Sequence, residues 1–424
     1  MMKNNLKILW FTNTPSLASQ KLGVNSYLGG WIASLEKEVV RLPEIELGIV
    51  FPYSDKRQPS FFLGSTTYFP VPMETRGRKI RDICKRWKHQ IEPAEEIGYY
   101  KEAVDKFKPD LIHVFGSERS FGLIGKHYQV PMILQIQGNM TVYTDKWFSG
   151  ITWLDVLRFG NKKSFLLGYG IFHSYYLFRK RAAREREMLS HCKHIIGRTD
   201  WDYRISRILA PESKYYHCDE LLRDQFRSAL WSYIERDERI LVSTLSPLTY
   251  KGLETILKTA MLLKKVNRFI FTWQVIGVSG NEEIIRITER ATKLKFRDNN
   301  VVFKGSLAPD ALADILTSCD CYVHPSHIEN SPNSVCEAML TGTPVIATAA
   351  GGTSSIVRDS EEGILVQDGD HYSMAGAVLQ LLNSPDIMKR FSGNARKRAL
   401  ERHNQEAIRD KLIEIYKDVL SSGK

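Results

Sequence analysis

Residues 324–351, H-P-S-H-I-E-N-S-P-N-S-V-C-E-A-M-L-T-G-T-P-V-I-A-T-A-A-G, decide the fold of the second half of this chain. A short strand is expected over 319–324, ending at the first residue of this stretch. Ser331 is a favourable helix N-cap, and Pro332 suits the first helical position because proline lacks the N–H that would stay unpaired there. The helix is expected to end at Gly342, a residue type typical of C-caps. The stretch therefore predicts a strand, a loop and a helix.

Two carboxylates flank the expected start of this helix. Glu329 lies in the loop before it, and Glu337 lies on its second turn. The free N–H groups at a helix start and the positive end of its dipole attract anions. Two carboxylates around such a site could hold a sugar and a ribose on either side of a diphosphate. An ordinary strand-loop-helix with two exposed glutamates fits the spacing as well.

The same stretch resembles the E-x7-E region of retaining glycosyltransferases of family 4. Glu329 and Glu337 are followed by 342–347, G-T-P-V-I-A, and the upstream segments 241–246 and 251–254, L-V-S-T-L-S and K-G-L-E, are similar to the segments that open that family's C-terminal domain. The resemblance is most specific over 240–370 and looser over 1–150. It implies an α/β chain with the GT-B fold, in which two Rossmann-like, doubly wound parallel-sheet domains hold a nucleotide sugar in their cleft.

The resemblance also implies a division of the chain. An N-terminal acceptor-side domain is expected over 1–228, and a nucleotide-sugar-binding domain over 235–400. An interdomain linker is expected over 224–239. A C-terminal helix over 405–424 is expected to cross back to the N-terminal domain. A chain of 424 residues is too long for one core, in agreement with two domains.

Site residues follow from the family's motif. Lys251 would neutralise the donor diphosphate, although Ser246 stands where the family usually has an arginine. Glu337 would hold the ribose hydroxyls, and Glu329 would hold the sugar near the reacting carbon. The remaining donor contacts are expected at the start of the helix, from Ser331, Asn333, Ser334 and Val335.

The first half alternates strands and helices, which predicts a parallel sheet with ligands at the carboxyl ends of its strands. The strands are expected at Leu6–Phe11, Ile45–Phe51, Leu111–Phe115, Met132–Gln135 and His194–Gly197. Gly29 and Gly30 open a helix where the family has a donor-facing glycine-rich loop, although the residues alone favour a simple loop-to-helix turn.

Three loop residues of the first half are further candidates. Gln137 stands where the family usually has a histidine beside the donor sugar, and glutamine can hydrogen-bond a hydroxyl but cannot carry charge. Glu118 and Arg198 are candidates for contact with an acceptor or a phosphate. A structural salt bridge is the alternative for Arg198.

The net charge of +11 is concentrated in residues 1–228, which hold 35 basic and 24 acidic residues. Such a domain favours an anionic lipid, a polyphosphate-linked acceptor or nucleic acid. Ser164–Phe178 is aromatic, lies between Lys162-Lys163 and Arg179-Lys180-Arg181, and is too short to span a bilayer. It suits a surface helix at headgroup level or a buried helix pair. The basic run 76–88 is either a solvated face or a second membrane contact.

Together with these observations, the resemblance implies a retaining, metal-independent hexosyltransferase of bacterial surface polysaccharide synthesis. Its partners would be a nucleotide-sugar donor, which is a co-substrate rather than a cofactor, and a saccharide or lipid-linked acceptor. No metal site is expected, because the Asp-x-Asp patterns at 200–202 and 368–370 lie away from the predicted site. A nucleotide-sugar 2-epimerase of the same fold and a basic nucleic-acid-binding protein are the alternatives, although no nucleic-acid module is recognised.

The expected location is the cytoplasm, with peripheral attachment to the inner face of the membrane. The six cysteines form no C-x-x-C pair and are expected to be reduced. The first apolar run, Leu6–Phe11, is too short for a secretory signal.

Overall fold

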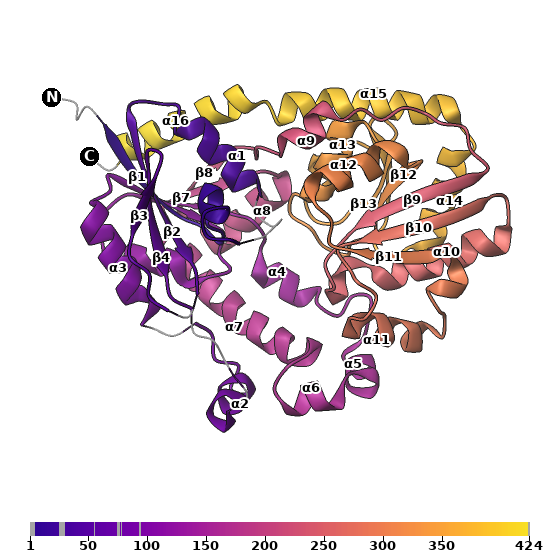
Figure 1. The fold of residues 1–424 in the computed structure, drawn as a ribbon, viewed down its shortest axis with the longest axis horizontal. Coiled ribbons are helices and arrows are strands. Elements are labelled where there is room, and N and C mark those ends of the chain that lie inside the picture. Colours follow the sequence, from indigo (N-terminus) through magenta and orange to yellow (C-terminus); the bar gives the residue numbers. More distant parts are fainter. Residues whose placement is uncertain are drawn as a thin grey trace. The chain divides into compact units, whose positions relative to one another are not determined.

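The computed structural model describes residues 5–24, 30–54, 56–73, 77, 79–92 and 95–422. It divides into two compact units (Figure 1). The first unit comprises Met1–Thr141, Leu177–Leu221 and His403–Lys424, and the second comprises Val142–Tyr176 and Leu222–Arg402.

The first unit is built on an eight-stranded sheet with strand order β3-β4-β2-β1-β5-β6-β7-β8. All neighbouring strands are parallel except β3 and β4, which form an antiparallel hairpin. The strands are β1 Leu6–Phe11, β2 Ile45–Pro52, β3 Phe61–Leu63, β4 Thr66–Val71, β5 Leu111–Phe115, β6 Met132–Gln135, β7 His194–Gly197 and β8 Lys214–His217. The five predicted strands are therefore confirmed, whereas the β3–β4 hairpin was not predicted.

Helices cover this sheet, and the C-terminal helix is held on it by a buried hydrogen-bond chain. The helices are α1 Gly30–Val39, α2 Ile80–Trp87, α3 Glu96–Phe107, α8 Asp200–Leu209 and α16 Gln405–Ser422, and α7 Ile171–Ser190 ends in this unit. The Tyr416 hydroxyl of α16 accepts from Trp10 Nε1 at 3.0 Å and lies 2.7 Å from His113 Nδ1. Burial lowers the pKa of His113 to about 3, so this histidine is a neutral core residue.

The second unit holds a six-stranded parallel sheet of order β11-β10-β9-β12-β13-β14. Its strands are β9 Glu238–Thr244, β10 Ile270–Ile276, β11 Val301–Gly305, β12 Cys321–His324, β13 Val345–Thr348 and β14 Gly363–Val366. Its helices are α9 Asp224–Ser228, α10 Leu253–Val266, α11 Glu283–Thr292, α12 Pro309–Ser318, α13 Asn333–Thr341, α14 His371–Leu382 and α15 Pro385–Arg402, with the shorter α4 Met140–Asp145, α5 Trp153–Phe159 and α6 Lys162–Leu166 preceding α7. The prediction of two parallel-sheet α/β units is confirmed.

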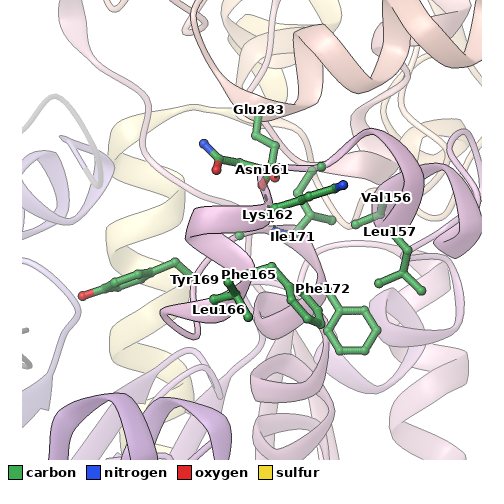
Figure 2. A pocket seen from close by; sticks show the side chains of 12 residues that line it. Val156, Leu157, Asn161, Lys162, Phe165, Leu166, Tyr169, Ile171, Phe172 and Glu283 are labelled. Carbon is green, nitrogen blue, oxygen red and sulfur yellow. Dashed lines mark hydrogen bonds between the residues drawn. The ribbon is translucent and has the colours of Figure 1, made fainter. Parts of the chain in front are cut away.

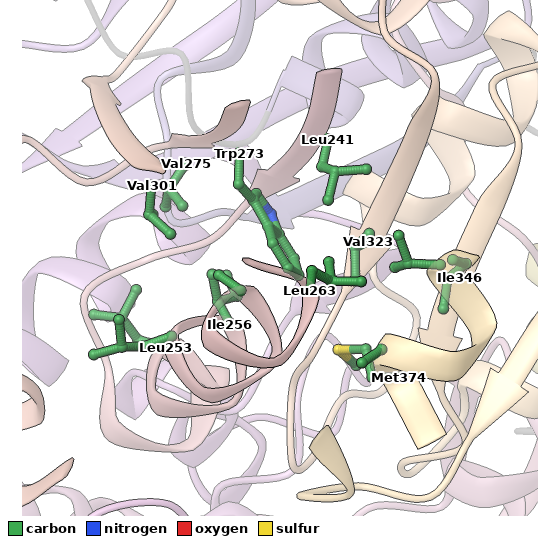
Figure 3. Packing of buried hydrophobic residues seen from close by; sticks show 14 of the residues in the cluster. Leu241, Leu253, Ile256, Leu263, Trp273, Val275, Val301, Val323, Ile346 and Met374 are labelled. Atoms are coloured by element: carbon green, nitrogen blue, oxygen red, sulfur yellow. The ribbon is translucent and has the colours of Figure 1, made fainter. Parts of the chain in front are cut away.

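Strands β12 and β13 are buried along their whole length, as is typical of a parallel sheet with helices on both faces. Trp273 of β10 is fully buried and points toward α10 in the packed cluster shown in Figure 3. Its indole Nε1 donates to Ser243 Oγ of β9 at 3.0 Å, and Ser243 Oγ donates to the Val323 carbonyl of β12 at 2.6 Å. The three central strands are thus joined through a satisfied polar contact inside an apolar core.

Two predicted boundaries differ from the structure. Residues 142–176 belong to the second unit, not to the predicted domain 1–228. The expected linker 224–239 contains α9 and Trp231, whose indole is buried and donates to the Cys319 carbonyl at 2.7 Å. The aromatic content of these segments predicts burial but does not reveal which sheet they cover.

The aromatic stretch Ser164–Phe178 is not one helix. The chain turns between α6 and α7 at Gly168 and Gly170, whose φ values of +77° and +92° favour glycine. Of the flanking cations, Arg181 pairs with Glu92 at 2.8 Å, and Lys180 donates to a backbone carbonyl of the first unit. Two of the three cations after the aromatic stretch are therefore engaged within the first unit.

Candidate functional site

Strand β12 leads through a loop to α13, and the start of this helix is the predicted anion site. Pro332 is the N-cap of this helix, and no side chain caps it, so the expected cap at Ser331 is wrong by one residue. Gly342 ends the helix with φ +78°, as predicted. The nine-residue helix is almost wholly buried, which fixes the position of its first turn.

The first turn of α13 leaves two N–H groups free. Val335 N–H donates to the Pro332 carbonyl at 3.0 Å. The N–H groups of Asn333 and Ser334 make no hydrogen bond to any residue that the structure describes, and both residues are only half-buried. Of the predicted helix-start contacts, these two therefore keep the geometry of an anion site, whereas the Val335 N–H is already used.

Lys251 and Glu329 come together in the second unit. Lys251 Nζ lies 2.5 Å from Glu329 Oε1, and both side chains are largely buried. Gly252 allows this approach: its φ is +76°, and a side-chain carbon there would lie 2.1 Å from the Pro325 carbonyl oxygen. The Lys-Gly pair thus places an ammonium group against the loop that precedes α13.

Glu329 is held ionised by several donors. Oε1 accepts from Ser326 Oγ at 2.9 Å and lies 3.3 Å from His324 Nε2, in addition to its contact with Lys251. Burial alone would raise the pKa of Glu329, but the Lys251 charge and the His324 contact outweigh it and lower the pKa to about 2. These contacts all use Oε1, and Oε2 has no hydrogen-bond partner among the described residues. One carboxylate oxygen is therefore open to a hydroxyl group.

Glu337 has a partner that the sequence did not reveal. Arg223 donates from Nε and from a terminal nitrogen to Glu337 Oε1, at 3.1 and 2.6 Å. Burial raises the pKa of Glu337 above its usual value, and Arg223 opposes that rise. Arg223 lies 114 positions before Glu337, so no local pattern pointed to it.

A second buried group lies beside this site and was also missed. His327 Nε2 lies 2.7 Å from Glu254 Oε1, and His327 Nδ1 lies 3.4 Å from Asp368 Oδ2. Burial opposes charge on both partners, but their mutual contact lowers the pKa of Glu254 and raises that of His327. The sequence indicates this pair only through its location: Glu254 comes shortly after the Lys-Gly pair, and His327 comes shortly before Glu329. Asp368 was expected to lie away from the predicted site, but its carboxylate lies beside His327.

The remaining candidates lie in the first unit. Arg198 is buried, forms an ion pair with Glu220, and donates to the Gln137 carbonyl at 2.7 Å. The guanidinium is therefore engaged in holding the loop after β6, which is the structural alternative considered for it. Gln137 lies in that loop, two residues after β6 ends.

Glu118 follows β5 and has an unusual environment. Burial, and then the nearby Glu185, raise its pKa to about 6, and Asn13 Nδ2 donates to its Oε2 at 3.3 Å. A carboxyl group with a raised pKa at the end of a strand is a candidate for binding or proton transfer. Gly30 begins α1, and Gly29 lies outside the described residues.

The described residues contain no cluster of three or more His, Cys, Asp or Glu side chains placed to hold a metal ion. None of their helices combines the length and apolar character needed to cross a bilayer.

Comparison with known protein families gives a match within the second unit. Residues 232–398 match the family model described as glycosyl transferases group 1. A D-inositol 3-phosphate glycosyltransferase from Thermomonospora curvata is 29% identical over 201 residues, which are 46% of this chain and 45% of that protein. The chain thus spans less than half the length of the curated relatives it matches.

Solved structures extend the likeness to both units at the level of fold. Sucrose-phosphate synthase from Thermosynechococcus elongatus superposes with a TM-score of 0.71 at 16% identity, over 99% of this chain and 100% of that one. An Anabaena protein, HepE, solved in complex with UDP and glucose, gives a TM-score of 0.64 at 12% identity, over 98% of this chain and 100% of that one. The chain therefore has the GT-B fold of glycosyltransferases, and its residues 232–398 match the glycosyl transferases group 1 family.

Proposed function

We propose that this protein is a retaining glycosyltransferase that moves a hexosyl-type group from a nucleotide-diphosphate sugar to a saccharide or lipid-linked saccharide. The proposed setting is bacterial surface polysaccharide synthesis. The observation that carries the proposal is the juxtaposition of Lys251 and Glu329 before the free N–H groups of α13. The matched family and the Anabaena protein solved with UDP and glucose support it.

Transfer requires that the leaving nucleoside diphosphate be stabilised as its bond to the sugar breaks. In the proposal, the Lys251 ammonium group, the N–H groups of Asn333 and Ser334, and the α13 dipole bind the diphosphate. These positive groups would perform this task without a metal ion. Glu337 would bind the ribose hydroxyls, with Arg223 keeping its carboxylate ionised.

Glu329 is proposed to orient the sugar. Its open Oε2 would accept a hydrogen bond from a sugar hydroxyl near the reacting carbon, while Lys251 holds Oε1 and bridges to the diphosphate. Retention would follow from attack on the same face as departure, with the departing phosphate oxygen taking the proton of the acceptor hydroxyl. This step needs no protein base and agrees with an ionised Glu329, which holds no proton at neutral pH.

Nucleotide binding gives a first test. Thermal unfolding in the presence of UDP, GDP, TDP or ADP should show a rise of melting temperature for the matching nucleotide, since saturation at a hundredfold excess over Kd adds about 2.7 kcal/mol. Lys251→Ala should abolish most of the rise, whereas Lys265→Ala, an exposed lysine of the same unit, should not. No rise with any nucleotide would contradict the proposal. Incubation of the donor alone, followed by a search for an epimer, separates transfer from 2-epimerisation.

A further inference from the structure

Large apolar side chains are concentrated on the surface of α5 and α6 in the second unit. Trp153, Leu154 and Leu166 are 52%, 59% and 68% exposed, and Leu157 and Tyr169 are exposed as well. These residues lie within a segment of only seventeen residues, 153–169. Isolated exposed apolar residues are ordinary, but a contiguous group marks an interaction surface. We call residues 152–170 the α5–α6 hairpin.

The hairpin also encloses an apolar pocket of about 280 Å³. Figure 2 shows Val156, Leu157, Phe165, Leu166 and Phe172 around it. The exposed side chains Leu157 and Leu166 therefore line the pocket as well as the surface. The pocket has the size and chemistry to take part of a hydrocarbon chain.

The hairpin is anchored firmly to the rest of its unit. Glu283 of α11 accepts from Asn161 N–H at 2.6 Å and from Ile171 N–H at 3.3 Å, at the two ends of the α6 turn (Figure 2). At the start of α5, Thr152 and Asp155 form a reciprocal capping box. The exposed apolar face is thus presented by a fixed element.

The exposed charged side chains of the hairpin are basic. Arg158, Lys162 and Lys163 are exposed and form no ion pair with any described residue. The single acidic residue of the segment, Asp155, is engaged in the capping box. The neighbouring Glu283 is engaged with backbone N–H groups. The hairpin therefore combines apolar and aromatic side chains with unpaired cations, the composition of elements that bind at the surface of anionic bilayers.

We infer that the α5–α6 hairpin docks the second unit on an anionic phospholipid bilayer, with acyl chains against its apolar pocket and lipid phosphates at Arg158, Lys162 and Lys163. The surface keeps Lys162-Lys163 and the first residues of the expected stretch Ser164–Phe178, but it does not include Arg179-Lys180-Arg181, which belong to the first unit. The inference rests on this surface and not on the proposed transfer reaction. It places the donor-binding unit at the membrane.

Co-sedimentation of the full chain with vesicles tests the inference in the absence of any nucleotide sugar. Wild type should sediment with vesicles of phosphatidylcholine and phosphatidylglycerol at 7:3 but much less with pure phosphatidylcholine. Lys162→Gln/Lys163→Gln should weaken partitioning roughly thirty-fold, at about 1 kcal/mol per basic residue. Lys265→Gln/Lys304→Gln, which removes the same charge from exposed lysines elsewhere in the unit, should bind as wild type does.

The apolar contribution is tested separately. Leu154→Ser/Leu166→Ser should lose most of the binding, whereas Tyr372→Ser, at an aromatic residue exposed elsewhere in the unit, should not. Brominated lipids should quench part of the wild-type tryptophan fluorescence, and Trp153→Phe should remove that part. Unchanged binding of both hairpin variants, or no binding by wild type, would overturn the inference. A wild-type dimer that Leu154→Ser/Leu166→Ser converts to a monomer, without lipid binding, would assign the surface to a second copy instead.

Discussion

Replacing Lys251 by Met should expose the energetic role of its ion pair with Glu329. The pair is largely buried, with Nζ and Oε1 2.5 Å apart. Burial acts to raise the pKa of Glu329, yet Lys251 and His324 lower it from 4.5 to about 2. This net shift corresponds to about 3 kcal/mol in favour of the ionised carboxylate. Lys251→Met leaves that carboxylate buried without its main partner, and we expect a loss of stability of about 3 kcal/mol.

Thermal unfolding measures this loss. For a unit of roughly two hundred residues, each kcal/mol shifts the melting temperature by about 2–4 °C, so Lys251→Met should lower it by roughly 6–12 °C at pH 7. The pH dependence has a defined sign. The folded carboxyl has the lower pKa, so between about pH 4.5 and 2 the unfolded state binds more protons, and stability falls as pH falls. In Lys251→Met this decline should become smaller, because the pKa of Glu329 in the folded state rises back toward its unfolded value.

The double variant Lys251→Met/Glu329→Gln supplies the control. It removes both charges together, so it should cost less than the sum of the two single variants by at least 1 kcal/mol. Additive effects within about 0.5 kcal/mol would show that the two groups are not coupled. That result would refute the account of the Glu329 environment.

Further predictions concern other ionisable groups. Arg223→Ala should weaken binding of the matching nucleoside diphosphate roughly ten- to a hundredfold by calorimetry, because Glu337 loses the partner that opposes the rise of its pKa. The loss should grow as pH falls, and unchanged affinity across the pH range would contradict it. Glu118→Gln should stabilise the protein by about 1–2 kcal/mol at pH 8 but little at pH 4.5. The pKa of Glu118 is raised to about 6 in the folded state, so the wild-type protein loses stability as pH rises through that value. An equal effect of the substitution at both pH values would contradict this. Contact with Glu254 raises the pKa of His327 in the folded state, so wild type should lose stability as pH rises above 6.5. His327→Asn should remove this loss. The same pH dependence of melting temperature in wild type and variant would disprove it.

The sequence predicts elements well where a local signal specifies them. Apolar runs predicted five strands of the first sheet with both ends within one residue, and Gly342 marked the end of α13. The start of that helix was misplaced at Ser331 because serine and proline both favour helix starts, and the backbone hydrogen bonds decide between them. Residues 142–176 were given to the wrong unit because their aromatic character does not specify which sheet covers them.

Residues of the candidate site could be predicted from the sequence only where they belong to a recognised motif. Lys251 and Glu329 were expected in one site and lie 2.5 Å apart, although 78 positions separate them. The pairing of Arg223 with Glu337 depends on how α9 packs against α13, which no local pattern encodes. Arg198 looked similar to a ligand-binding cation, and only its buried partners reveal a structural role.

Turnover by Glu329→Gln tests the central claim most directly. With the nucleotide sugar whose diphosphate stabilises the protein, we measure release of nucleoside diphosphate by wild type, by Glu329→Gln and by Glu361→Gln, an exposed carboxylate of the same unit. Glutamine cannot supply the charged acceptor for the sugar or the partner for Lys251, so release should fall by roughly 10²-fold or more in a folded protein. Glu361→Gln should match wild type. Near wild-type release by Glu329→Gln would contradict the account.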